Sequence, residues 1–284
     1  MRKILVFVSS LVIALSLGSI GASATRIKEV ESNNTVNEAQ LITRNNVNPS
    51  TVITAKYEGQ NVVEGNVADS SDVDWYKVYL PADNNTIFAI NSTSLSYDSN
   101  IEILDENLNI VSAFKHIQDT KKLGATPYKV KISKEGYYYV KISSIVRGGN
   151  YLFTIGGPNY TVDSYTYKSA NTLTITPKET SDTMSFDLTR NSNIPDGAVV
   201  YEVKLGGSKK NSALSETRSL KLSSERNWTR TSSYVFNAKF PVISNTLLKS
   251  RWDVKLEGSV SKYTKYYSVT PEIRFLYVYP ELPR

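Results

Sequence analysis

The stretch Asp69-Ser70-Ser71-Asp72-Val73-Asp74-Trp75-Tyr76-Lys77-Val78-Tyr79-Leu80 joins an oxygen-rich turn to a run of alternating side chains. Tyr76, Val78 and Leu80 fall on one face of an extended chain, and the residues between them fall on the other face. Alternation with a period of two is typical of a strand that buries one face. The stretch therefore predicts a β-strand that begins directly after a turn rich in carboxylates.

The same period recurs along most of the chain, with turn residues between the alternating runs. Many short strands separated by such turns are typical of β-sandwiches and small barrels. We also expect an extended segment over residues 51–57 and an exposed loop over residues 206–211. The other expected strands are residues 86–90, 100–105, 108–112, 137–142, 151–155, 172–176, 185–188, 198–205, 219–222, 233–240, 251–257 and 266–279.

A domain boundary is predicted at Gly156-Gly157-Pro158-Asn159, because glycine and proline together interrupt strands. The charge changes sign there. Residues 25–157 contain 13 basic and 15 acidic side chains, whereas residues 158–284 contain 18 basic and 12 acidic ones. We therefore expect a first domain over residues 25–157 and a basic, β-rich domain of unknown family over residues 158–284.

The N-terminus has the features of an export signal. Arg2 and Lys3 precede an apolar run over residues 4–20, and Ala22-Ser23-Ala24 offers a small-residue cleavage site. A retained membrane anchor is the alternative. No later run is apolar for long enough to span a bilayer. The sequence predicts a signal peptide over residues 1–24 and a secreted, extracellular protein.

A second oxygen-rich segment, Glu29-Val30-Glu31-Ser32-Asn33-Asn34, lies about forty residues before the Asp-rich turn. Calcium prefers six to eight oxygen ligands, which one acidic hexapeptide rarely supplies. Two such segments brought together form a candidate calcium site. The alternative is that both segments are solvated loops whose acidic side chains cap turns.

Taken in order, several motifs make the first half similar to a known family, the bacterial pre-peptidase C-terminal domain. This family includes the collagen-binding domains of clostridial collagenases. The resemblance covers about residues 27–155. Its motifs are Glu29-Val30-Glu31-Ser32-Asn33-Asn34, Gly65 followed by Asp72-Val73-Asp74-Trp75-Tyr76, Ile103-Leu104-Asp105, Gly136-Tyr137-Tyr138-Tyr139-Val140 and Gly149-Asn150-Tyr151.

The resemblance implies a jelly-roll-like β-sandwich in which the two acidic segments share calcium. Asn34 stands where the family has aspartate, and Ser71 stands where some calcium-binding members have an acid, so either weaker affinity or the loss of one ion is expected. The tyrosines that collagen-binding members use after the Gly-x-Tyr-Tyr strand are replaced here by Ser143 and Ile145. The implied ligands are Glu29, Glu31, Asn33, Asn34, Asp72 and Asp74.

Catalytic chemistry has little support in the sequence. The chain has no cysteine and one histidine, which excludes a thiolate site and a multi-histidine zinc site. We expect His116 to lie on the surface, and Asp182 and Asp187 alone do not make an active site. Tyr137 and Tyr139 are predicted to point outward, opposite Tyr138, and are candidates for a binding surface.

We therefore expect an all-β protein: a jelly-roll-like β-sandwich followed by a second β-sandwich-like domain. The expected function is non-catalytic binding to an extracellular polymer or protein of the cell wall, the matrix or a polysaccharide, with no nucleic-acid partner. The alternatives are a secreted hydrolase with its catalytic part in the second domain, and a secreted toxin or inhibitor component. An exposed apolar loop in the second domain would favour the last alternative.

Overall fold

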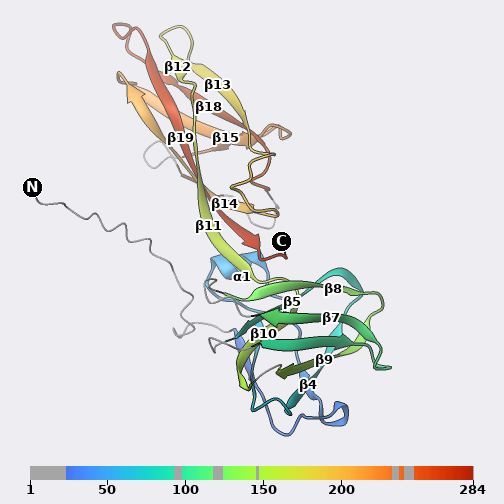
Figure 1. The fold of residues 1–284 in the computed structure, drawn as a ribbon. Coiled ribbons are helices and arrows are strands. Elements are labelled where there is room, and N and C mark those ends of the chain that lie inside the picture. The colour runs from blue at the N-terminus through green and yellow to red at the C-terminus, as the bar shows by residue number, and fades with distance from the viewer. Residues whose placement is uncertain are drawn as a thin grey trace, which may run out of the picture. The chain divides into compact units, whose positions relative to one another are not determined.

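The structure is a computed structural model that describes residues 24–92, 98–117, 124–144, 147–231, 237–239 and 246–283. The chain packs into two units, one made of Met1–Arg44 with Gln60–Gly156 and the other of Asn45–Gly59 with Gly157–Arg284. Strands dominate both units (Figure 1). The predicted all-β class with two sandwich-like domains is confirmed. The expected signal peptide lies outside the described residues except for Ala24.

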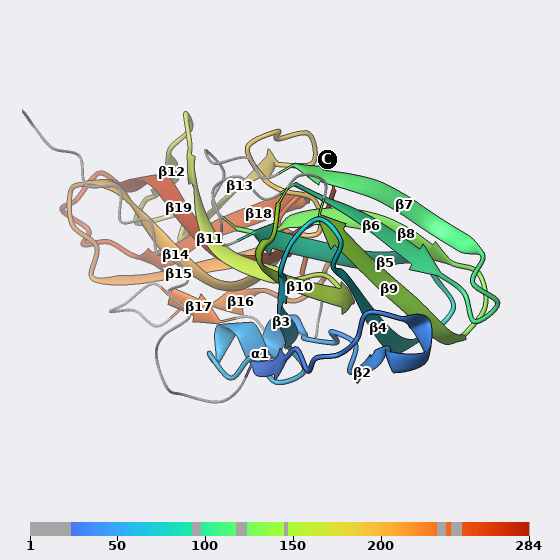
Figure 2. The ribbon, with the colours of Figure 1, turned by 60° about the horizontal axis from the view of Figure 1, so that its bottom comes forward.

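The first unit contains two five-stranded sheets, and Figure 2 shows strands of both, with β6 and β7 of the second sheet side by side. The expected strands over residues 100–105 and 108–112 are confirmed as β6 and β7, which pair antiparallel as a hairpin. A 3-10 turn, η1 (Val36–Glu38), precedes β2. The first sheet has the order β1 (Thr25–Lys28), β3 (Asn61–Val67), β10 (Gly149–Gly156), β5 (Asp83–Ser92), β8 (Thr126–Ile132); the second has the order β2 (Gln40–Ile42), β4 (Val73–Leu80), β9 (Gly136–Ser144), β6 (Asp98–Leu104), β7 (Ile110–Ile117).

The core of the first unit lies between these sheets. Tyr76, Val78 and Leu80 of β4 are fully buried, as their alternation predicts. From the other sheet, Phe88 and Phe153 stack with ring centroids 5.3 Å apart. Each side chain of this size contributes roughly 1.5–3 kcal/mol through burial, so the alternating pattern largely determines which faces meet.

The second unit is also built from two sheets. Residues 160–168 form a strand that the sequence analysis did not predict, although Tyr165 and Tyr167 alternate with polar residues there. One sheet has the order β11 (Tyr160–Lys168), β19 (Tyr267–Pro280), β14 (Val199–Lys210), β17 (Asn237–Lys239), with β12 (Leu173–Ile175) also paired to β19; the other has the order β13 (Ser181–Asp187), β18 (Arg251–Ser259), β15 (Ser215–Leu222), β16 (Thr229–Arg230).

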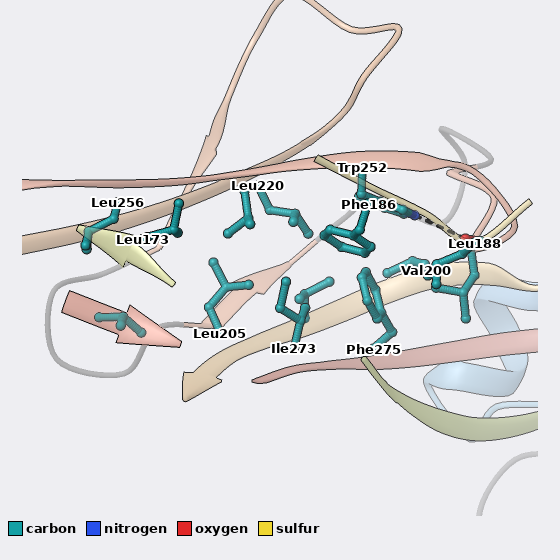
Figure 3. Packing of buried hydrophobic residues seen from close by; sticks show 14 of the residues in the cluster. Leu173, Phe186, Leu188, Val200, Leu205, Leu220, Trp252, Leu256, Ile273 and Phe275 are labelled. Atoms are coloured by element: carbon teal, nitrogen blue, oxygen red, sulfur yellow. Dashed lines mark hydrogen bonds between the residues drawn. The ribbon is translucent and has the colours of Figure 1, made fainter. Parts of the chain in front are cut away.

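Aromatic side chains meet at the centre of the second core. In Figure 3, Phe186 and Trp252 of one sheet point toward Phe275 of the other. The rings of Trp252 and Phe275 have centroids 5.1 Å apart. The indole Nε1 donates a hydrogen bond to the Leu248 carbonyl at 3.1 Å, so this fully buried tryptophan has a partner for its polar atom.

The segment Asn45–Gly59 belongs to the second unit although first-unit residues flank it on both sides. It contains a helix, α1 (Pro49–Ile53), where the sequence analysis expected an extended chain. Asn48 caps the helix by accepting from Thr51 N at 3.1 Å, and Pro49 follows at the first helical position. This is a favourable helix start, and it overrides the short alternation.

The apolar side of this segment packs on the second unit. Val47 and Val52 are buried against Val199 of β14 and Val278 of β19. The expected boundary between residues 157 and 158 is therefore close to the observed chain passage at Gly156–Gly157, but residues 45–59 group with the second unit rather than with the first.

The expected loop over residues 206–211 is instead mostly strand, because β14 continues to Lys210. Its glycines permit a close approach to β19. A Cβ on Gly207, whose φ is +133°, would lie 2.3 Å from the Thr270 carbonyl oxygen. Glycine here serves a strand contact and not a turn.

Candidate functional site

An N-terminal arm, defined here as residues 29–34, crosses between the two sheets of the first unit. It follows β1, which pairs in parallel with β3 in the first sheet. It leads through η1 into β2, which pairs in parallel with β4 in the second sheet. Trp75 N donates to the Asn33 carbonyl at 2.9 Å and joins the arm to the start of β4.

The crossing gathers three carboxylates from distant parts of the sequence. One oxygen each of Glu29, Glu31 and Asp74 lie within 4.8 Å of one another. The predicted meeting of the N-terminal segment with the Asp-rich turn is therefore confirmed for these three side chains. We call them the carboxylate cluster.

Two tyrosine hydroxyls close the inner side of the carboxylate cluster. Tyr76 donates to Glu29 Oε1 at 2.6 Å, and Tyr151 donates to Asp74 Oδ2 at 2.6 Å. The two hydroxyl oxygens are 2.5 Å apart. A Cβ on Gly65 would lie 2.4 Å from the Tyr151 hydroxyl, so this position has no space for a larger residue. Alternation assigns these tyrosines to the core but does not reveal what their hydroxyl oxygens contact, so both hydroxyls were missed as site residues.

The cluster has an excess of negative charge. Among the described residues, no lysine or arginine forms an ion pair with Glu29, Glu31 or Asp74. Burial raises the pKa of Asp74 to about 8, and repulsion from Glu29, Asp72 and Glu31 acts in the same direction. Burial and the neighbouring acids Glu29 and Asp72 also raise the pKa of Glu31. The site therefore favours either a proton or a cation.

Two buried oxygens at this site have no hydrogen-bond donor among the described residues. They are Asp74 Oδ1 and Asn33 Oδ1, and both residues are fully buried. The amide of Asn33 is held at the cluster, since its Nδ2 donates to Glu29 Oε1 at 3.0 Å. Unpaired buried oxygens are rare in folded proteins and call for a partner.

The other predicted ligands have different environments. Asp72 Oδ2 accepts from Ala68 N at 2.6 Å and closes the turn before β4, although its charge still acts on Glu31 and Asp74. Asn34 is exposed, in contrast to the buried Asn33 beside it. Of the six predicted ligands, the structure thus brings Glu29, Glu31 and Asp74 together and places Asn33 in contact with them.

The donor set fits a hard divalent cation. All candidate ligands are carboxylate or amide oxygens, which calcium prefers. A cation would satisfy the unpaired oxygens and offset the repulsion that raises the pKa values of Asp74 and Glu31.

A second feature lies on the solvent side of β4 and β9. Across the pair, Lys77 is opposite Tyr139 and Tyr79 is opposite Tyr137. Lys77 Nζ lies 4.8 Å from the Tyr137 ring centroid and 5.5 Å from that of Tyr139. Trp75 makes an edge contact with Tyr139 at 6.2 Å. We call Trp75, Lys77, Tyr79, Tyr137 and Tyr139 the aromatic face.

The predicted orientation of the tyrosines is confirmed. Tyr137 is 41% exposed, and Tyr139 lies on the same face but is half-buried beside Lys77, whereas Tyr138 points inward and is buried. Beside the aromatic face, on the same sheet, lies a shallow depression of about 400 Å³ lined by Glu102, Lys115 and Lys141 among others.

His116 is buried, which corrects the expectation that it lies on the surface. It points inward from β7, and its Nδ1 lies 3.1 Å from the Tyr128 hydroxyl. Its neighbours in sequence, the charged Lys115 and the apolar Ile117, are both exposed because alternate residues of a strand face opposite sides, so the exposed neighbours do not predict the buried histidine. The residue is part of the packing of the first unit.

The paired acids of the second unit also have structural partners. Asp182 accepts from Thr174 N at 2.8 Å. Asp187 accepts from Thr189 and from Arg251, and these contacts lower its pKa to about 2. Both carboxylates are thus engaged in holding strands and turns.

No family model matches the chain, and no curated protein matches it significantly. A solved structure of a predicted secreted protein from Eubacterium rectale is similar over 93% of this chain and 90% of its own, with 15% identity and a TM-score of 0.55. The pre-peptidase C-terminal domain of a collagenase from Bacillus anthracis aligns with 41% of this chain and 93% of its own, with 13% identity and a TM-score of 0.28. The first comparison shows that the secreted protein has a similar fold across the length of both units. In the described residues, no helix is long and apolar enough to cross a membrane.

Proposed function

We propose that this chain is an exported binding protein without catalytic activity. Its first unit acts as a module of the pre-peptidase C-terminal type that attaches to an extracellular polymer or protein. The second unit is a basic β-domain with a separate contact surface. The likeness to a predicted secreted protein and the export signal in the sequence support the location.

The aromatic face is the observation that carries the binding role. Rings of tryptophan and tyrosine offer a large contact area and lose little conformational entropy on binding. Here each ring is held by a cross-strand neighbour, as Tyr79 and Tyr137 are with centroids 5.4 Å apart. Lys77 adds a cation, and its ammonium group lies over the rings of Tyr137 and Tyr139. Rings exposed side by side on neighbouring strands suit an extended polymer of the cell wall, the matrix or a polysaccharide.

Calcium has a structural role in this proposal. Glu29, Glu31 and Asp74 would hold the ion with Asn33, and the ion would supply the positive charge that the carboxylate cluster lacks. Because these residues come from the arm and from β4, the ion would link the two sheets at the crossing. It would also keep β1 and β2 in place and so protect the edges of β3 and β4.

The proposal that the chain is not catalytic is based on the surroundings of its candidate acid and base side chains, which are engaged in structural contacts. Asp182 and Asp187 are engaged in turn and strand contacts, and His116 is buried beside Tyr128. The carboxylate cluster takes Glu29 and Glu31 from the arm and is packed against two tyrosine hydroxyls on its inner side, which suits ion binding better than catalysis.

The binding role is tested by sedimentation of the whole chain with insoluble cell wall, fibrillar collagen and insoluble polysaccharide. We expect the wild type to bind at least one of them. The Tyr137→Ala/Tyr139→Ala pair should lose most of this binding, whereas Tyr137→Phe/Tyr139→Phe should keep it because the rings remain. A thermal melt of each variant checks folding. The proposal fails if the wild type binds none of the three, or if the alanine pair binds as well as the wild type.

A further inference from the structure

One end of the second unit brings three chain connections together. They are residues 176–180 between β12 and β13, residues 211–214 between β14 and β15, and residues 260–266 between β18 and β19. Leu214 N donates to the Ser259 carbonyl at 2.8 Å, and Gly258 N donates to the Thr180 carbonyl at 2.9 Å. Asn211 Nδ2 donates to the Tyr266 carbonyl at 2.8 Å. These bonds fix the three connections side by side.

Two apolar side chains project from this end. Tyr263 is 84% exposed and Leu214 is 74% exposed, the highest values among the large hydrophobic side chains of the described residues. Single exposed apolar residues are common on protein surfaces. Here, however, the two most exposed ones lie on adjacent connections at the same end.

Lysines surround these two side chains. Across residues 209–216 and 260–266 the sequence has four lysines, Lys209, Lys210, Lys262 and Lys265, and one acid, Glu216. Glu216 is engaged inward: Arg218 Nη2 lies 2.6 Å from its Oε1, and Lys209 Nζ lies 2.9 Å from its Oε2.

The remaining lysines lie among tyrosines. Lys262 Nζ is 5.0 Å from the Tyr263 ring centroid, and Lys210 Nζ is 5.6 Å from that of Tyr266. Lys265 is exposed on the same connection as Tyr263. We call residues 209–216, which include the ends of β14 and β15, together with residues 260–266 the lysine-rich end.

We propose that the lysine-rich end docks on the surface of an anionic phospholipid bilayer. Tyrosine prefers the boundary between headgroups and acyl chains, and an exposed leucine gains free energy when it enters that layer. Lysines beside them are attracted to anionic headgroups. A soluble polyanion would use the lysines but would gain nothing from Leu214. A protein partner would need a larger continuous apolar patch than these two side chains supply.

The test is sedimentation of the whole chain with vesicles of phosphatidylcholine alone and of phosphatidylcholine mixed with phosphatidylglycerol. We expect binding to the mixed vesicles and little binding to the neutral ones. Leu214→Ser/Tyr263→Ser should lower the partition coefficient roughly tenfold. Lys210→Gln and Lys262→Gln should each lower it roughly fivefold.

Matched controls come from the same unit. Val162→Ser removes an exposed apolar side chain from β11, and Arg190→Gln removes an exposed cation from the turn after β13. Both should bind as the wild type does. The lysine-rich end lies on the surface, so all variants should melt as the wild type does. In a Tyr263→Trp variant, the extra tryptophan fluorescence over that of the wild type should be quenched by brominated lipid if this side chain enters the bilayer.

Two results would overturn the proposal. One is the absence of binding to the mixed vesicles. The other is binding that falls with the lysine substitutions but is unchanged in Leu214→Ser/Tyr263→Ser, because this would assign the lysine-rich end to a soluble polyanion.

Discussion

The Tyr151 hydroxyl donates a hydrogen bond to Asp74 Oδ2 at 2.6 Å, although the two residues are 77 positions apart. Tyr151 lies on β10 of one sheet and Asp74 on β4 of the other, so this bond spans the sandwich. It keeps a buried carboxylate beside Glu29 and Glu31, where its charge is opposed by no cationic side chain of the described residues. Most of the expected behaviour of the first unit follows from this arrangement.

Calcium should stabilise the protein against heat. If the carboxylate cluster holds the ion, a calcium concentration a hundredfold above Kd adds roughly 2.7 kcal/mol to the free energy of unfolding. Thermal melts with calcium and then with chelator should therefore differ by several degrees. Asp74→Asn should lose this difference, while Asp83→Asn, which changes an exposed carboxylate at the start of β5 outside the cluster, should keep it. Equal melting temperatures of the wild type in both conditions would remove the ion from the proposal.

The metal-free protein should become less stable as the pH rises. The pKa of Asp74 in the folded state is about 8, above the value near 3.8 that an ordinary aspartate has. The folded state therefore holds a proton that the unfolded state has released, and stability is lost as pH rises from about 4 through 8. Denaturant unfolding in chelator across this range measures the slope. Asp74→Asn should flatten it, since the amide stays neutral, and calcium should do the same by replacing the proton. A slope of the opposite sign would contradict the assignment.

Replacement of Gly65 should disrupt the carboxylate cluster by displacing the two tyrosine hydroxyls on its inner side. A Cβ there would lie 2.4 Å from the Tyr151 hydroxyl and 2.7 Å from the Tyr76 hydroxyl. Gly65→Ala should cost about 1–3 kcal/mol of stability and weaken the calcium response. Gly136→Ala is the matched control, because a Cβ at that position meets nothing within 4 Å. Denaturant midpoints of the two variants give the comparison, and equal midpoints would show that the tyrosine pair yields easily.

In the second unit, Arg218 and Arg251 should differ strongly in their contribution to stability. Arg218 is buried, contacts Glu216 and donates to the Gly206 carbonyl at 2.9 Å. Its replacement by methionine leaves the partly buried Glu216 carboxylate with Lys209 as its remaining described cation and removes the donor to the Gly206 carbonyl, so it should cost about 3 kcal/mol. Arg251 pairs with Asp187 on the surface with its side chain 74% exposed, and Arg251→Met should cost less than about 1 kcal/mol. Chemical unfolding of both variants tests this, and similar losses would contradict it.

Alternation predicted the fold class and most strands, because in a strand with one buried face apolar side chains recur at every second residue. It also indicated that Tyr137 and Tyr139 face outward. It failed for residues 51–57, where a cap at Asn48 starts a helix, and for Gly207, where a close strand approach resembles a turn in the sequence. In each case the deciding contact comes from local capping or from a distant strand.

The candidate site was predicted in part for the same reason. Acidic residues at two places in the sequence indicated an ion site, and Glu29, Glu31 and Asp74 do meet. The hydroxyls of Tyr76 and Tyr151 could not be predicted, because only the register of β10 against β3 and β5 brings them to the carboxylates. The burial of His116 was hidden by its charged and exposed neighbours in sequence.

Because residues 45–59 pack with the second unit, the protein cannot be divided into its two units by one cut in the gene. A gene cut at Gly156 would leave the downstream product without Val47 and Val52, and Val199 and Val278 would then face water. The upstream product would carry a stray helix in the middle of its own chain. A single cut at Gly156 therefore divides the second unit as well as the chain, and an intact second unit needs residues 45–59 to be supplied with it.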